Sequence, residues 1–209
     1  MKPTNSTTHN DAPPSHIWRW LGLSAVLLMA GSVLAIALIS AGVFDPQPIG
    51  EESGQWTLET VELAPGAREL MWLEERHLPA SYTVRLRASF IEGNPDAGYG
   101  LALGQEEAFL ATAVSPTGYV TIWREASGSK REEIIPWQTW PHVAPGSDDN
   151  EIQIDVGEDN VTIRINRELL WQGQMSMAGD RVALYGESFA TGASIQFQEL
   201  RLFTEEADG

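Results

Sequence analysis

The chain of 209 residues contains no cysteine. This absence excludes disulfide bonds, thiol catalysis, zinc–thiolate sites, thioether-linked haem and a lipidated N-terminal cysteine. Basic residues are also few, with Lys+Arg 13 against Asp+Glu 29 and a formal net charge of -16. Because the phosphates of nucleic acids require a basic surface, no nucleic-acid partner is expected. The chain does contain enough apolar sequence for a folded core, since 43% of its residues are hydrophobic.

One long uncharged run lies near the N-terminus, at residues 20–44. About 20 apolar residues span the hydrocarbon core of a bilayer, and a buried helix of a soluble protein is rarely apolar on all sides for so long. Trp18 and Trp20 stand at the start of the run, where aromatic residues of a membrane interface gather. We therefore expect residues 20–44 to form a transmembrane helix, which makes the lipid bilayer a partner.

The charges that flank this run predict its orientation. The preceding arm, residues 1–19, carries Lys2 and Arg19, whereas acidic residues follow the run and the next basic residue is Arg68. The positive-inside rule keeps such an arm in the cytoplasm and places the C-terminal part outside the cell membrane. An uncleaved signal anchor is expected; the alternative is a signal peptide cleaved near the small residues 40–42, although such peptides usually have shorter apolar cores.

The pattern beyond the run is that of β-strands. Residues 45–55 are rich in proline, glycine and acid, which indicates a linker, and residues 56–209 are expected to form one extracytoplasmic domain. Residues 82–90 alternate between apolar and polar side chains, as a half-buried strand does. Runs 151–156 and 161–166 alternate as well, and the four-residue turn between them predicts an antiparallel hairpin.

The pairing inside this hairpin follows from keeping its apolar residues on one face. If Val156 is opposite Val161, then Gln153 is opposite Arg164 on the polar face. Other strand candidates are 56–62, 70–74, 98–103, 109–114, 118–124, 169–171, 181–186 and 193–203. The last run loses its alternation, and a bulge near Gln198 would restore it. About ten short strands at this spacing predict an all-β domain, a two-sheet antiparallel jelly-roll sandwich.

The C-terminal half resembles the concanavalin A-like/laminin-G-like jelly roll. A loop with Gly146 and Asn150 leads into the hairpin, and the closing strands fall near 179–184 and 195–203. The family usually has Asn-Gly after the second hairpin strand, whereas this chain has Asn166 followed by arginine. The resemblance implies the fold. It leaves the activity open, because the family includes β-glucanases, 3-keto-disaccharide hydrolase-type domains, and modules that bind glycans or proteins, sometimes through calcium.

A hydrolase of this fold would need a pair of carboxylates. The β-glucanases carry Glu-x-Asp-x-x-Glu along one strand, and the nearest match here is Gln153, Asp155 and Glu158. Gln153 cannot act as a carboxylate nucleophile and Glu158 falls in a turn, so no catalytic residue is assigned. We expect Asp155 and Arg164 to form a surface pair instead. The enzyme hypothesis requires a second carboxylate within about 9 Å of Asp155, supplied by Glu125, Glu187 or Glu199.

Aromatic residues mark the expected ligand surface. Trp137 and Trp140 stand three apart in a segment flanked by prolines, and such rings could stack on sugars. Tyr119 and Trp123 would lie on an outer face if the residues between them are buried. That face would be a groove shared with polar residues of other strands, namely Arg85, Arg87, Gln153, Asp155 and Arg164. The alternative is that the rings fill the edges or the core of the sandwich.

Two oxygen-rich loops, 148–150 and 158–160, leave calcium open as a ligand, although Asp and Asn are also ordinary turn residues and the spacing is irregular. No metal or cofactor is assigned. The sequence thus predicts a non-catalytic, single-pass, membrane-anchored recognition module that binds a glycan or a protein. The alternatives are a membrane-tethered glycoside hydrolase-like enzyme and an accessory subunit of a membrane complex.

Overall fold

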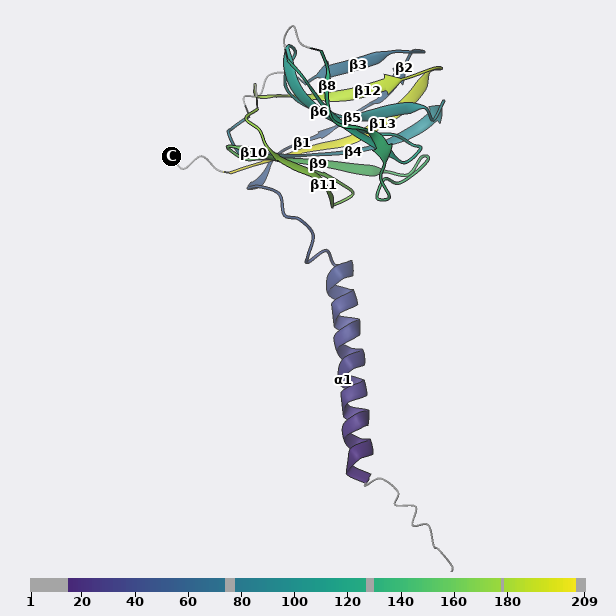
Figure 1. Ribbon diagram of the computed structural model, residues 1–209, viewed down its shortest axis with the longest axis vertical. Helices are drawn as coiled ribbons and strands as arrows, with labels where there is room; N and C mark the ends of the chain where they lie inside the picture. Colours follow the sequence, from purple (N-terminus) through teal and green to yellow (C-terminus); the bar gives the residue numbers. More distant parts are fainter. Residues whose placement is uncertain (1–14, 74–77, 127–129, 178, 206–209) are drawn as a thin grey trace, which may run out of the picture. The chain divides into compact units, whose positions relative to one another are not determined.

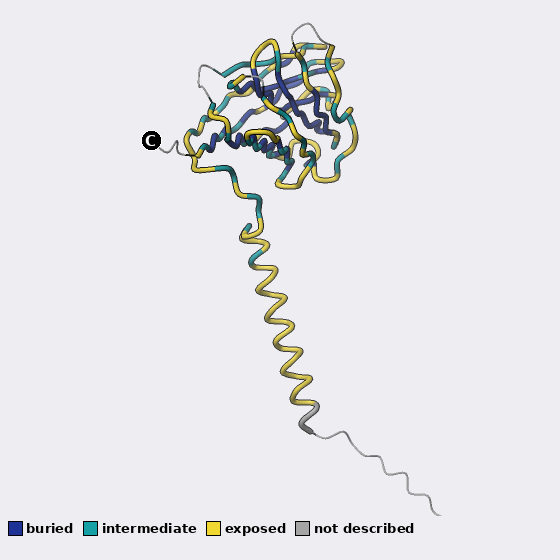
Figure 2. The backbone as a smooth tube through the Cα atoms, turned by 60° about the vertical axis from the view of Figure 1, so that its left-hand side comes forward, coloured by how far each residue is buried: buried dark blue, intermediate teal, exposed yellow. Residues whose placement is uncertain are grey.

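The computed structural model describes residues 15–73, 78–126, 130–177 and 179–205, with side chains from Trp18 onward. It divides into two units, residues 1–46 and 47–209, which we describe separately. The first unit contains helix α1 (Ser15–Ser40), which begins earlier and ends earlier than the expected span 20–44. From Trp18 to Ser40 it has a mean hydropathy of 2.4 and buries none of its side chains, so it is long and apolar enough to span a membrane (Figure 2).

The second unit is a sandwich of two antiparallel sheets, and the expected jelly-roll fold is confirmed (Figure 1). Sheet A has, in spatial order, β1 (Glu51–Thr57), β13 (Ala193–Thr204), β4 (Tyr82–Gly93), β9 (Asn150–Val156), β10 (Asn160–Ile165) and β11 (Glu168–Gln174), with β2 (Thr60–Leu63) also paired to β13. Sheet B has β3 (Arg68–Trp72), β12 (Arg181–Ser188), β5 (Ala97–Gln105), β6 (Ala108–Val114), β7 (Tyr119–Glu125) and β8 (Glu132–Thr139).

One apolar core lies between the two sheets. Alternate residues of each strand point into it, so that Leu86 and Ile152 of sheet A and Leu101 and Ile122 of sheet B are fully buried in the same cluster. Figure 2 shows the buried residues running along the strands, with exposed turns between them. The side chains that lie between these core positions point to the outer faces of the sheets, and those faces carry the polar chemistry.

The predicted hairpin register is confirmed, with Val156 opposite Val161 and Gln153 opposite Arg164. The expected irregularity in β13 is present as a register shift between Phe197 and Glu199.

Two boundaries and one whole strand differ from expectation. The linker predicted over 45–55 is too long, because β1 begins at Glu51 and pairs with β13. The run 56–62 is interrupted after Thr57, so it belongs to two strands rather than one. Strand β8 was not predicted at all, because proline interrupts its alternation at Pro136. Backbone pairing with a neighbouring strand defines these segments, and a side-chain pattern does not reveal it.

The turn between β10 and β11 is a tight two-residue turn although it lacks glycine. Asn166 and Arg167 both have positive φ, at 50° and 74°. A two-residue hairpin turn with both central residues in this region is type I′, and it favours glycine at the second position. Arg167 therefore holds a backbone conformation that strains an ordinary residue.

Replacing Arg167 with glycine is expected to raise the free energy of unfolding by about 0.5–1 kcal/mol, because relief of the left-handed strain exceeds the entropy that glycine adds to the unfolded chain. Urea denaturation of the full chain in detergent micelles, followed by tryptophan fluorescence, measures the change. Glu168→Gly, one residue further along at the start of β11, serves as the control and should be destabilising. Equal effects of the two variants would contradict this account of the turn.

Candidate functional site

The sequence-predicted site residues lie on opposite outer faces of the sandwich. Arg85 and Arg87 are on β4, Gln153 and Asp155 on β9, and Arg164 on β10, all in sheet A. Tyr119, Trp123 and Trp137 belong to sheet B. The expectation of one shared groove is therefore wrong. Alternation fixes the face within a strand, but it does not say which strands share a sheet.

The polar residues of sheet A form a closed hydrogen-bonded ladder. Asp155 accepts hydrogen bonds from Thr83 Oγ1 at 2.8 Å, Gln153 Nε2 at 2.6 Å and Arg164 Nη1 at 2.5 Å. Arg85 Nε donates to Gln153 Oε1 at 2.9 Å, and Gln153 is only 1% exposed. The expected pairing of Asp155 with Arg164 is confirmed. With three donors on its carboxylate, Asp155 has a structural role.

None of the three proposed carboxylate partners stands beside Asp155. Glu125 and Glu187 are on sheet B, on the far side of the core. Glu199 is in sheet A, where it pairs with Arg201 Nε at 2.9 Å and lies opposite Arg87 in the strand register. Asp155 lies opposite Thr83, four residues from Arg87 along the same strand, which is about 13 Å. None of the three carboxylates that the enzyme hypothesis required is therefore placed to work with Asp155.

The two tryptophans that were expected to form a platform also point apart. Trp137 packs on the outer face of sheet B, against the cluster that contains Trp123 and Tyr185. Trp140 packs against the core between the sheets, and its ring lies 5.7 Å from that of His142. Trp137 alone remains a candidate for ligand contact.

The outer face of sheet B has a floor of small residues. On the two central strands β5 and β6, the outward positions include Gly98, Gly100, Ala102, Ala111 and Ala113. A Cβ atom on Gly98 would lie 3.0 Å from the ring of Trp137, so this ring reaches over the glycine. Bulky residues flank the floor on β12, β7 and β8. The absence of side-chain bulk at the centre leaves room for their rings to lie across it.

Two of these rings meet above the floor. Trp123 of β7 and Tyr185 of β12 are separated by strands β5 and β6, yet their ring centroids are 4.7 Å apart and inclined at 62°. Both side chains are 0% exposed. The expectation of Trp123 as an exposed platform is wrong, although it does lie on the outer face as the alternation indicated. The ring is covered by neighbouring side chains rather than by the opposite sheet.

Arginines cover the two rings. The guanidinium carbon of Arg131 lies 4.1 Å from the centroid of the Trp123 ring, and that of Arg68 lies 5.7 Å from Trp123 and 5.8 Å from Tyr185. Arg68 on β3 also forms an ion pair with Glu125 on β7. Those strands are four steps apart, about 19 Å on a flat sheet, which exceeds the combined reach of the two side chains. Sheet B must therefore be concave on this face.

Carboxylates complete the polar lining of the concave face. Glu187 accepts a hydrogen bond from the Tyr185 hydroxyl at 2.5 Å, and Glu125 accepts one from Arg68. Burial raises the pKa of Tyr185, and its hydrogen bond to Glu187 raises it further. Tyr185 therefore stays protonated and remains a donor. Each carboxylate is thus held by a neighbouring donor, and the face presents fixed donors and acceptors beside aromatic rings.

An exposed aromatic rim borders this face. The rings of Trp137 and Phe189 pack edge to face with centroids 6.1 Å apart, and Phe189 is 44% exposed. Tyr119, on the outer side of β7, is 41% exposed. We define the concave face as the outer surface of sheet B formed by Arg68, Tyr119, Trp123, Glu125, Arg131, Trp137, Tyr185, Glu187 and Phe189. Three of these nine residues were predicted as ligand contacts, and Glu125 and Glu187 were named only as possible partners of Asp155. The other four were not named as site residues; the alternation of 181–186, tested for its outward side, would have found Tyr185.

The oxygen-rich loop before β9 is closed by amide hydrogen bonds. Asn150 is 0% exposed; its Nδ2 donates to the Tyr99 hydroxyl and to Ala144 O, both at 2.9 Å, and its Oδ1 accepts from Ala144 N at 2.8 Å and from Asn166 Nδ2 at 2.8 Å. Asn166 Nδ2 also donates to His142 O at 2.7 Å. The Asn150 side chain is thus committed to the fold. Within the described ranges, no three His, Asp or Glu side chains gather as they would around a metal ion.

Alkaline pH is expected to destabilise the domain through its buried tyrosines. Burial raises the pKa of Tyr99 from 10.0 to about 12. The unfolded chain then releases this proton near pH 10 and the folded chain only near pH 12, so the free energy of unfolding falls as the pH rises through that window. Urea midpoints at pH 9 and pH 12 should differ by less in Tyr99→Phe than in the wild type. Identical differences would contradict the assignment.

Comparisons with known proteins point to the fold rather than to a family. No protein-family model matches the sequence, and no curated protein is detectably similar to it. Among solved structures, an endo-acting O-glycanase expressed by members of the human gut microbiota aligns over 70% of this chain and 79% of its own, with 5% identity and a TM-score of 0.54.

Two further structures complete the comparison. A Bacteroides ovatus GH16 protein in complex with a product of mixed-linkage glucan aligns over 69% of this chain and 80% of its own, with 7% identity and a TM-score of 0.50. A carbohydrate-binding module from Bacillus subtilis aligns over 73% of this chain and 91% of its own, with 12% identity and a TM-score of 0.46. At such identities the likeness is one of fold alone.

Proposed function

We propose that this protein is a single-pass membrane protein whose jelly-roll domain lies outside the cell membrane and binds a glycan on its concave face. The observation that carries the proposal is the juxtaposition of aromatic rings with fixed polar groups on one hollowed surface. The rim rings of Tyr119, Trp137 and Phe189 offer apolar surfaces to sugar faces, and the arginine and glutamate side chains offer hydrogen bonds to hydroxyl groups. The same fold holds a mixed-linkage glucan product in the Bacteroides ovatus structure.

The charge of the domain narrows the ligand class. Residues 45–209 carry 11 Lys+Arg and 28 Asp+Glu, a difference of -17. On the concave face itself, Arg68 and Arg131 are balanced by Glu125 and Glu187. A domain with this net negative charge repels polyanions at distances up to about the Debye length of the solution. We therefore propose a neutral glycan rather than a sulfated or acidic one.

The membrane setting rests on α1 and on its flanking charges. Lys2 and Arg19 precede the apolar span, and by the positive-inside rule these charges favour a cytoplasmic arm over residues 1–19. The domain, which begins at Gln47, is then displayed outside. Protease added to sealed spheroplasts should digest the domain and leave the arm protected.

A glycan array probed with the full chain in nanodiscs, with and without calcium, tests the binding. Tyr119→Ala and Trp137→Ala are expected to weaken retention at least tenfold, because each removes a ring from the rim. Leu169→Ala is the matched control: this residue is 49% exposed, but it lies on β11 of sheet A. If glycan retention were unchanged in both rim variants, the concave face would not be the binding site. If no glycan were bound in either buffer, a protein partner would be favoured instead.

A second candidate, a hydrolase, is favoured by one observation: Glu125 and Glu187 share the concave face, and both lie near Arg68. Against it, the Glu125 carboxylate is already engaged in an ion pair with Arg68, so it is not free to serve as the partner of Glu187. Mass spectrometry of the retained glycans decides between the two. Cleavage products that vanish in Glu187→Gln would establish an enzyme, whereas intact glycans support a binding module.

A further inference from the structure

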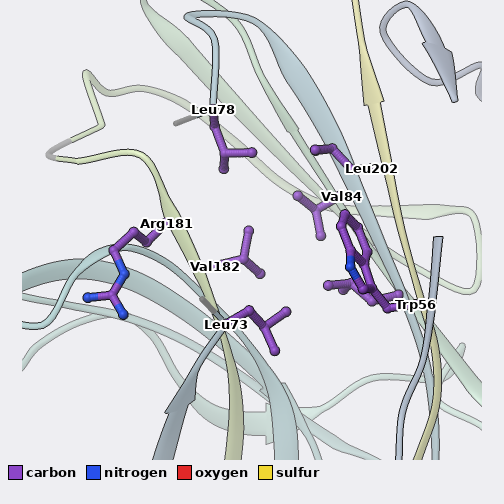
Figure 3. A pocket seen from close by; sticks show the side chains of 8 residues that line it. Trp56, Leu73, Leu78, Val84, Arg181, Val182 and Leu202 are labelled. Atoms are coloured by element: carbon purple, nitrogen blue, oxygen red, sulfur yellow. The ribbon is translucent and has the colours of Figure 1, made fainter. Parts of the chain in front are cut away.

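An apolar pocket of about 250 Å³ opens between the two sheets (Figure 3). Sheet A contributes Trp56 of β1, Val84 of β4, and Leu200 and Leu202 of β13; the opposite wall is formed by Leu73, Leu78, Arg181 and Val182. Val182 belongs to the core cluster between the sheets, whereas Ala183, the next residue of β12, belongs to the cluster on the outer face. The pocket therefore lies on the other side of sheet B from the concave face, and it is a separate site.

Among the described residues, the core is not sealed at this pocket. Trp56, Leu73 and Leu78 are half-buried, whereas Leu101 and Ile152 deeper in the same core are 0% exposed. Protein interiors are normally packed without voids larger than a water molecule. A cavity of about 150 Å³ with apolar walls is already enough to bind a benzene ring. The space between the sheets is thus large enough for a small apolar ligand.

Backbone hydrogen bonds hold the leucines of the sheet B wall in place. Leu73 N donates to Val182 O at 2.9 Å, and Leu78 N donates to Asp180 O at 3.3 Å. Both leucines are thereby attached to β12 and to the residue that precedes it. Because their backbones are hydrogen-bonded to the sheet, the side chains of Leu73 and Leu78 are held in position, and the pocket is an integral part of the sandwich.

The side chains that line the pocket favour a hydrocarbon ligand. Among the described residues that form it, Arg181 alone is charged, and its guanidinium is turned away from the other labelled side chains (Figure 3). That group lies 5.2 Å from the ring of Trp72 and pairs with Glu106 at 3.3 Å, so only its aliphatic stem borders the pocket. Sugar hydroxyls or phosphates would lose their hydrogen bonds there. We propose that this pocket binds a single hydrocarbon chain, carried by a fatty acid or by a membrane lipid.

The chain itself can bring a lipid source close. Residues 41–48 connect the end of α1 to Ile49, whose backbone N–H donates to Thr83 Oγ1 at 2.8 Å. Fully extended, this connection spans at most about 30 Å. The lipid source rests on the membrane anchoring proposed above, whereas a free fatty acid would reach the pocket in any setting.

Photolabelling of the full chain in phosphatidylcholine nanodiscs tests the pocket. One arm adds a diazirine analogue of decanoic acid, and the other builds a diazirine phosphatidylcholine into the disc; cross-linked peptides are mapped by mass spectrometry. We expect label on the peptides that contain Leu73, Leu78 or Leu202. Label from the acid alone identifies a free ligand and label from the lipid alone identifies a membrane chain. Either result supports the pocket.

Chain length supplies a quantitative signature. Each buried methylene strengthens binding about fourfold, so decanoate should compete with the label about 15-fold better than octanoate. Leu73→Trp and Val182→Phe fill the pocket and should reduce domain labelling at least tenfold. Leu170→Trp, at a half-buried leucine of β11, is the matched control and should leave it unchanged. Circular dichroism confirms the fold of each variant.

The same experiment separates this proposal from membrane anchoring. Labelled α1 peptides with an unlabelled domain in both arms would overturn the pocket while leaving the anchor intact. Domain labelling that persists in a folded Leu73→Trp or Val182→Phe variant would overturn it as well. An unlabelled α1 with domain label from the acid would retain the pocket and reject the anchor.

Discussion

Trp123→Ala is expected to lower the free energy of unfolding by about 3–5 kcal/mol, the usual cost of deleting a buried aromatic side chain. Trp123 lies on an outer face of the sandwich, yet it is 0% exposed, because Tyr185 packs at 4.7 Å and Arg131 at 4.1 Å from its ring. Deleting it removes the partner of both groups and leaves a cavity over the alanine floor. Urea denaturation of the full chain in detergent micelles measures the loss.

Tyr119→Ala is the matched control for this prediction, because Tyr119 is an outward aromatic residue on the same strand β7 but is 41% exposed. It should cost less than about 1 kcal/mol. If the two variants were equally destabilised, the rings above the floor would not act as a second packed cluster.

Much of the fold could be predicted because the information is local. Alternation identified the β9–β10 hairpin and its register, and the lost phase of β13 located the shift between Phe197 and Glu199. The segments that were missed lack this local signal. Strand β1 begins with Glu51 and Glu52 and has no apolar face of its own there, and β8 contains Pro136. Their strand character comes from the neighbours to which they pair.

The site was harder to predict because it depends on which strands share a sheet. Tyr119 and Arg85 both alternate with core residues, so the sequence could place each on an outer face. It could not show that these faces are opposite, since that follows from long-range strand order. Arg68 and Glu125 lie 57 residues apart, and their ion pair exists only because sheet B is concave. Glycine and alanine on β5 and β6 were the overlooked signal: small outward residues on adjacent strands indicate a floor that other side chains cover.

Asn150→Asp is expected to cost about 2–4 kcal/mol at neutral pH, because it places a carboxylate where a buried amide donates two hydrogen bonds and accepts others. The Asn150 Nδ2 atom donates to Tyr99 and to Ala144 O, and the new carboxylate oxygen would face both without a proton. Asn160→Asp is the matched control, since Asn160 begins β10 as Asn150 begins β9 but is exposed. It should change stability by less than about 0.5 kcal/mol.

The pH dependence of the stability of Asn150→Asp distinguishes the loss of hydrogen bonds from the loss of steric fit. Burial raises the pKa of a carboxyl group at position 150 above that of an unfolded aspartate, so protonation favours the folded state. Below the unfolded value of about 4 most of the electrostatic cost should disappear, and it should grow as the pH rises toward the raised folded value. Urea midpoints of Asn150→Asp and Asn160→Asp measured at pH 4 and pH 8 give the comparison, with the difference between the two variants smaller at pH 4. If the difference did not depend on pH, the Asn150 amide would contribute through its steric fit. Its hydrogen bonds to Tyr99 and to the 142–149 loop would then contribute little to holding that loop against β9.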